Sequence, residues 1–158
     1  MINNWQGYTN KMLFHSRLLI EAWESADEIA KPAFHGACLN AMIQAYHSLL
    51  AEIMTNHRLP VMRLPSLTDA INGVHEKGEV SSELNYIEHL GQNDSWLAVL
   101  LKSHEECLMP VAQKRVDRNE IPVFNENSIR YDLPGTLLSA LESLKELVAY
   151  SRNFSLEW

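Results

Sequence analysis

Two side chains that can bind a metal ion lie three residues apart in the second half of the sequence. His104 and Cys107 share one face if this segment is helical, so an imidazole and a thiolate could act as two ligands. His47 could supply a third ligand, because helical bundles build metal sites from side chains on facing helices. The alternative is a solvated His104 beside two glutamates, with Cys107 as core filler. A metal-dependent bundle enzyme that uses His47, His104 and Cys107 is therefore one hypothesis for the function.

The spacings of the seven histidines otherwise match no common metal motif. No histidine follows a glutamate by three residues, and no two histidines are four residues apart. The sequence also has no Gly-x-Ser-x-Gly turn, and its six glycines occur singly rather than in a phosphate-binding loop. We therefore predict no catalytic residue and no cofactor, and the sequence favours a protein that is not an enzyme.

A polar strip interrupts an otherwise apolar segment in the first half of the chain. Asn40, Gln44 and His47 recur at spacings of four and three residues, which places them on one side of a helix. They could form the wet side of that helix, a polar network against a neighbour, or the lining of a small-ligand pocket near Tyr46 and Trp96. Ligand binding by Asn40, Gln44 and His47 is the third function that we consider.

Apolar residues repeat with helical spacing over the first thirty positions. The expected inward face consists of eight residues, Trp5, Tyr8, Met12, His15, Leu19, Ala22, Ala26 and Ile29. His15 is the polar member of this stripe, and we interpret it as a histidine at the edge of the core. Either Asn3 or Asn4 can cap the start of the helix.

The next long segment, 33–56, carries two adjoining apolar stripes, which is typical of a helix with neighbours on several sides. A third long helix is predicted over 135–153. Shorter helices are expected near 67–78, 82–90 and 96–109, the first with a capping box formed by Ser66 and Asp69.

The predicted fold is therefore all-α, an up-and-down bundle of three long helices near 4–30, 33–56 and 135–153 in a single domain, 1–158. Residues 110–134 contain three prolines and many charges, and we expect them to form a long, irregular and mobile connection.

Charge and composition narrow the classes of partner. The net charge of −7 leaves no basic surface for a phosphate backbone, so nucleic acid is not expected as a partner. No run of apolar residues is long enough to cross a membrane, the two cysteines do not suggest a disulfide framework, and the chain begins without a signal-peptide pattern. We expect a cytoplasmic protein with no membrane partner.

Tryptophans near both ends of the chain suggest a contact with another protein. Trp5 and Trp158 are large apolar anchors at positions where chains usually fray, so each needs a packed surface. That surface could belong to the chain's own bundle or to a partner. The first functional hypothesis is therefore a non-catalytic interaction or structural module, with a homodimer or another protein as partner.

Several short motifs resemble those of a small bacterial protein family. They are Trp5, Tyr8-Thr9-Asn10-Lys11, Arg58-Leu59-Pro60, Asp94-Ser95-Trp96-Leu97 and the closing Glu157-Trp158. In this order and spacing they resemble a gammaproteobacterial family of unknown function whose members are about this long. The resemblance implies a helical, cytosolic protein, and it carries no activity or catalytic residue to transfer.

Overall fold

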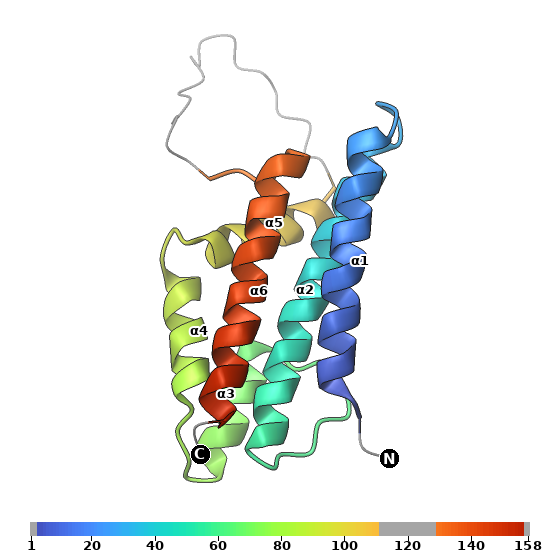
Figure 1. The fold of residues 1–158 in the computed structure, drawn as a ribbon. Helices are drawn as coiled ribbons and strands as arrows, with labels where there is room; N and C mark the ends of the chain where they lie inside the picture. The colour runs from blue at the N-terminus through green and yellow to red at the C-terminus, as the bar shows by residue number, and fades with distance from the viewer. Residues whose placement is uncertain (1–2, 111–128, 157–158) are drawn as a thin grey trace, which may run out of the picture.

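The computed structural model describes residues 3–110 and 129–156, and within these ranges the chain is helical with no strand (Figure 1). The helices are α1 (Trp5–Ser25), α2 (Lys31–Asn56), α3 (Leu67–Glu76), α4 (Ser82–Gln92), α5 (Trp96–Leu108) and α6 (Pro134–Leu156). The all-α prediction is confirmed, and each expected helix is present with slightly different bounds. Most of the expected irregular connection, residues 111–128, lies outside the described residues, as does Trp158.

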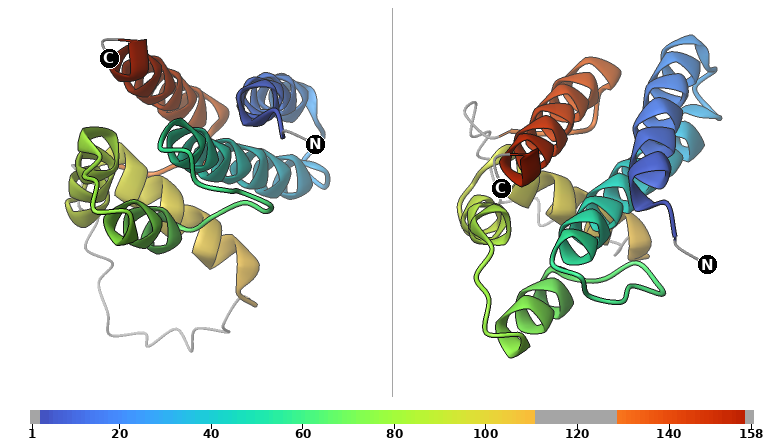
Figure 2. Two further views of the ribbon diagram at one scale, coloured as in Figure 1. Left: turned by 90° about the horizontal axis from the view of Figure 1, so that it is seen from below. Right: turned by 60° about the horizontal axis from the view of Figure 1, so that its bottom comes forward.

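Helix α2 lies at the centre of the molecule and contacts all five other described helices. Its two apolar stripes are buried on different neighbours, as its sequence predicts. Figures 1 and 2 show α1, α2 and α6 side by side, with α5 lying obliquely across α2 and with α3 and α4 on the far side from α1. The simpler description, an up-and-down bundle of three long helices, is not confirmed, because three shorter helices complete the packing around α2.

Polar side chains cap the starts of four helices. The side chain of Asn4 accepts a hydrogen bond from the Gly7 amide at 2.8 Å, which confirms one of the two expected caps of α1. Ser66 and Asp69 form the predicted capping box at α3, with both reciprocal bonds present. The Ser81 and Ser95 hydroxyls accept hydrogen bonds from the Leu84 and Ala98 amides in the first turns of α4 and α5. These local signals explain why the helix starts were predictable.

The end of α1 differs from the prediction. The helix ends at Ser25 rather than Ala30, because the Asp27 carboxylate accepts a hydrogen bond from the Ala30 amide at 2.8 Å and so stabilises a turn. Ile29, expected on the inward face, is 93 % exposed in that turn. Helix α2 starts two residues earlier than expected, at Lys31, because proline is tolerated in the first turn of a helix.

The buried face of α1 is also rotated from the expected one. Thr9 and Ser16 lie at its centre and are fully buried, whereas His15, Leu19 and five other members of the expected stripe lie at its edges or outside it. The Ser16 hydroxyl donates to the Met12 carbonyl at 2.7 Å. The buried hydroxyls therefore have partners, and their small volume lets α2 approach closely.

A hydroxyl network joins α1 to α2 at the same seam. The hydroxyl oxygens of Thr9 and Ser48 are 2.8 Å apart, and each lies 3.0 Å from the Trp5 carbonyl oxygen. Hydrogen bonds of this kind give the buried hydroxyl and carbonyl groups between two helices the partners that water would otherwise supply.

An arginine ties the three longest helices together. Arg152 on α6 binds both carboxylate oxygens of Glu52 on α2, at 2.9 and 3.0 Å. It also donates to the Asn10 side chain and to the Gln6 carbonyl on α1, at 3.0 and 3.5 Å. The Glu52 side chain is only 10 % exposed, so its charge depends on this partner.

None of the described helices is both long enough and apolar enough to span a lipid bilayer.

Candidate functional site

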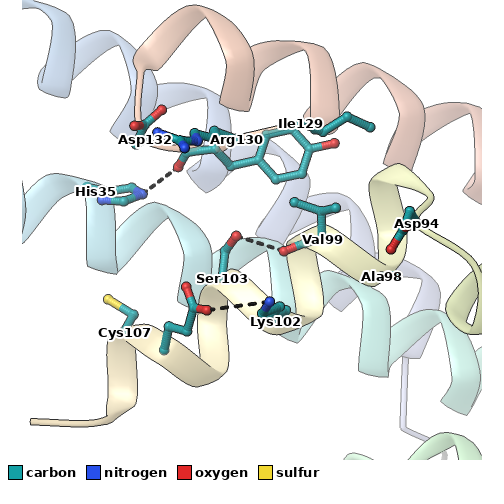
Figure 3. A pocket seen from close by; sticks show the side chains of 12 residues that line it. His35, Asp94, Ala98, Val99, Lys102, Ser103, Cys107, Ile129, Arg130 and Asp132 are labelled. Carbon is teal, nitrogen blue, oxygen red and sulfur yellow. Dashed lines mark hydrogen bonds and ion pairs between the residues drawn. The ribbon is translucent and has the colours of Figure 1, made fainter. Parts of the chain in front are cut away.

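A hollow lies between α5, the first turns of α2 and the residues that lead into α6 (Figure 3). Its volume is about 920 Å³. Its lining consists of His35, Asp94, Ala98, Val99, Lys102, Ser103, Glu106, Cys107, Ile129, Arg130, Tyr131 and Asp132. Helix α5 supplies half of this lining, and Cys107 near its end and Asp94 just before its start stand at opposite ends of that wall.

His35 positions the segment that closes one side of the hollow. Its Nε2 lies 2.7 Å from the Tyr131 carbonyl oxygen (Figure 3), and a carbonyl only accepts, so Nε2 carries a proton and donates. The imidazole also stacks on Trp23, with ring centroids 4.7 Å apart. Tyr131 is buried, and burial raises the pKa of its phenol. His35 thus holds the start of this segment against α1 and α2.

The same histidine lines a second hollow. This hollow has a volume of about 550 Å³ and lies between the Trp23 end of α1 and residues 132–134. The two hollows share His35 and Asp132 in their linings. A ligand in either hollow would therefore contact a ring whose position is set by a hydrogen bond and a stack.

The polar groups of the larger hollow carry charges of both signs. Lys102 and Glu106 are 4.0 Å apart on the exposed side of α5, a separation at which an ion pair contributes little. The Ser103 hydroxyl donates to the Val99 carbonyl at 2.7 Å, so it is engaged within its own helix (Figure 3). The chemistry available here is ionic and hydrogen-bonding recognition of a polar ligand.

The predicted polar strip faces several different neighbours. Gln44 accepts a hydrogen bond from the Tyr8 hydroxyl of α1 at 2.7 Å. His47 lies on another side, with Nδ1 2.8 Å from the Pro65 carbonyl oxygen in the connection between α2 and α3. Asn40 is exposed. None of the three lines either of these hollows, so their role in binding a ligand stays a prediction.

The three candidate metal ligands are only partly brought together. The Nε2 atom of His104 is buried without a hydrogen-bond partner, and burial, followed by the charge of His47, lowers the pKa of this imidazole. The thiol of Cys107 is exposed next to Gly36 instead, about 16 Å along α2 from His47. Within residues 3–110 and 129–156, no three His, Cys, Asp or Glu side chains are placed to hold a metal ion. The metal-dependent function stays a prediction.

Comparison with known proteins adds a family and no activity. The model of a family of unknown function, DUF6586, matches residues 1–158. The chain belongs to this family. No curated protein and no solved structure matches it. The resemblance to a family of unknown function is confirmed at this level, and the assignment of roles to DUF6586 residues must come from the structure itself.

His35 and Tyr131 are the residues of this region that the sequence alone does not reveal. They are 96 positions apart, so no local pattern joins them. Trp23 and His35 are different, because they lie at similar distances, five and seven residues, from Glu28 at the middle of the short connection between α1 and α2. Two antiparallel helices place such residues level with each other, so this contact was available from the sequence.

Large apolar side chains are exposed at several places in the described part of this DUF6586 chain, Met62, Leu108, Met109 and Leu133 among them, and two further groups lie on helices. On α1, Phe14 is 59 % exposed and Leu18 is 45 % exposed, one turn apart. Between α4 and α6, Tyr86, Tyr150 and Phe154 form a half-exposed aromatic cluster with ring centroids 4.9 and 5.3 Å apart. The cluster joins two helices whose backbones have little direct contact, so it has a structural task, whereas the α1 pair has none within the described chain.

Proposed function

We propose that this protein is a non-catalytic interaction module that associates with a second copy of itself through the outer face of α1. The observation that carries the proposal is the adjacent pair Phe14 and Leu18, both large, apolar and exposed. Full burial of such a side chain contributes about 1.5–3 kcal/mol, so a surface that covers the pair is favoured.

The rest of α1 prepares this pair for contact. Its opposite face is packed on α2 and fastened by the hydroxyl network of Thr9 and Ser48, and its side is held by Arg152. Side chains on a helix that is already immobilised lose little backbone entropy when a partner binds.

Mass measurement by light scattering after size-exclusion chromatography tests the proposal. At rising concentration up to a few hundred micromolar, we expect the wild-type mass to move from that of one chain toward that of two. Phe14→Glu and Leu18→Glu should each hold the protein at the mass of one chain. Val80→Glu is the matched control, because Val80 is 79 % exposed but lies between α3 and α4. A wild-type mass of one chain throughout the series contradicts the proposal.

A second candidate function is the binding of a small polar molecule in the hollow beside His35. The observation in its favour is a space of about 920 Å³ lined by cationic and anionic side chains, which suits a ligand that carries both charges. Free amino acids and other small zwitterions are the probes, with binding measured by isothermal titration calorimetry. We expect binding to be lost in His35→Ala and kept in Glu21→Ala, and a flat titration with every probe would remove this candidate.

A further inference from the structure

The outer face of α1 carries a continuous stripe with the spacing of a helix-pairing seam. Its six members recur at alternating distances of four and three residues, and they are Gly7, Lys11, Phe14, Leu18, Glu21 and Ser25. All but Gly7 are exposed. A stripe that repeats every three or four residues stays on one side of a helix and can be covered along its length by a second helix.

The stripe is symmetric about Ser16 in a way that matters for pairing. Phe14 and Leu18 lie two residues on either side of this centre, and Lys11 and Glu21 lie five residues on either side. Each apolar residue is thus matched by an apolar one, and the positive charge is matched by the negative one. The small residues Gly7 and Ser25 are matched in the same manner at the two ends.

We propose that two copies of the chain pair antiparallel along this stripe, about a two-fold axis level with Ser16. This inference rests on the proposed function and names its surface and geometry. In this register Phe14 packs on Leu18 of the second copy, twice by symmetry, and Lys11 lies opposite Glu21 of the second copy, also twice. A parallel pairing would instead oppose lysine to lysine and glutamate to glutamate, which costs free energy.

The ends and charges of the stripe fit this arrangement. The ends of the stripe carry no large side chain of their own, and the Asn4 side chain lies beside Gly7. Within each chain, Nε of Arg17 lies 3.3 Å from a carboxylate oxygen of Glu21 and orients that carboxylate on the outer face. Four apolar side chains and two exposed ion pairs make a small interface, so we expect a reversible dimer with a Kd on the order of 10–100 µM.

Cysteine cross-linking tests the register directly. Lys11→Cys and Glu21→Cys are made separately in a Cys107→Ser background, mixed at a few hundred micromolar and oxidised mildly. The buried Cys38 does not interfere, because burial raises the pKa of its thiol to about 12. The antiparallel register places positions 11 and 21 opposite each other, whereas two copies of position 11 lie about 15 Å apart along the axis. We expect disulfides between positions 11 and 21 in at least about five-fold excess over those between identical positions.

A matched control separates docking from random collision. Lys11→Cys mixed with Glu76→Cys, an exposed position on α3, should give only the background yield. Equal yields from the two mixtures, or an excess of links between two copies of position 11, overturn the antiparallel register.

Charge reversal gives an independent reading without cysteines. In the antiparallel register Lys11→Glu turns two attractive pairs into repulsive ones, so we expect the dimer to be about ten-fold weaker, and adding Glu21→Lys to restore it. A parallel dimer would be unchanged by Lys11→Glu, which overturns the inference while the proposed self-association stands. If the wild-type chain never exceeds the mass of one chain, the proposed function fails and this inference fails with it.

Discussion

On α1, two small polar side chains are buried and two large apolar ones are exposed, against the usual trend. The buried face has small polar residues, Thr9 and Ser16, at its centre, and the exposed face has the large apolar residues Phe14 and Leu18. The buried hydroxyls are satisfied by carbonyls of their own helix one turn earlier, at 3.0 and 2.7 Å, so their burial costs little. The exposed apolar pair has no such compensation inside the described chain.

Side-chain volume and hydrogen-bond satisfaction, rather than polarity alone, therefore decide which side of α1 is buried. Small side chains let α1 and α2 approach along most of their length, and this is the most extensive contact between any two helices here. A leucine at position 16 would hold the helices apart, whereas the leucine at position 18 is 45 % exposed and is accommodated at the surface. The inner face is therefore explained by contacts within this chain, and for the outer face we propose a second surface.

Filling the inner face should give the largest effect. Ser16→Leu adds three carbon atoms at a site with no exposed surface, and we expect a loss of about 3 kcal/mol of unfolding free energy from overpacking and loss of the close seam. Urea unfolding followed by circular dichroism measures this loss. Ser16→Ala is the control, with an expected loss below about 1 kcal/mol. Similar losses in the two variants would show that volume at this position is not limiting.

Removal of the Arg152 side chain, which binds the side of α1, should give the second-largest effect. Arg152→Ala leaves the mostly buried Glu52 without its partner, and we expect a loss of about 2–3 kcal/mol, less than for a fully buried pair because Arg152 itself is partly exposed. The double variant Arg152→Ala with Glu52→Gln should recover part of the loss, since no unpaired charge remains. A double variant less stable than Arg152→Ala alone would contradict this account.

The stability of the contact between α1 and α2 should also depend on alkaline pH, through Cys38 of α2. Burial raises the pKa of the Cys38 thiol from 9.0 to about 12, so the folded chain keeps a proton that the unfolded chain releases. The stability that depends on this group is complete below pH 9 and is lost as the pH rises toward 12. Between pH 8 and pH 10, wild type should lose about 1.4 kcal/mol more than Cys38→Ala. Urea unfolding with a reductant checks this, and equal losses would place the thiol in contact with water.

Truncation of the outer face should have the smallest effect on the single chain. Leu18→Ser removes an exposed side chain, and we expect the unfolding free energy to change by less than about 0.5 kcal/mol, measured by urea unfolding at low micromolar concentration. The same change should weaken self-association. A loss above 1 kcal/mol at this concentration would mean that Leu18 packs within its own chain.

The sequence predicts the helices of this fold much better than their contacts. Apolar residues at three- and four-residue spacing predict α1, α2 and α6, and Asn4 and Ser66 predict two of the starts, because spacing and caps are local properties. The same reasoning does not predict the rotation of the buried face of α1. Hydrophobicity ranks His15 and Leu19 by residue type alone. It does not take into account that a hydroxyl such as that of Ser16 can bond to its own helix and be buried. The end of α1 was misplaced because Asp27 bonds to a backbone amide three residues away.

The contacts of the candidate site were harder to predict from the sequence than the helices of the fold. The hydrogen bond from His35 to Tyr131 joins α2 to the residues just before α6, with α3, α4 and α5 between them in the sequence, and nothing in the neighbourhood of either residue encodes it. For the predicted polar strip, the sequence places the residues on one helix but does not predict their partners. Gln44 and His47 share α2, but Gln44 bonds to Tyr8 and His47 bonds to Pro65, which belong to different elements.

A dilution series followed by backbone amide NMR tests the central claim most directly, that the outer face of α1 is a contact surface. Spectra of the wild-type chain from about 500 to 10 µM should show concentration-dependent shifts concentrated at Lys11, Phe14, Leu18 and Glu21, with the buried Thr9 and Ser16 affected far less. The same series on Leu18→Ser should show almost none. Spectra that do not change with concentration, or changes centred on Tyr86 and Tyr150, would contradict the account.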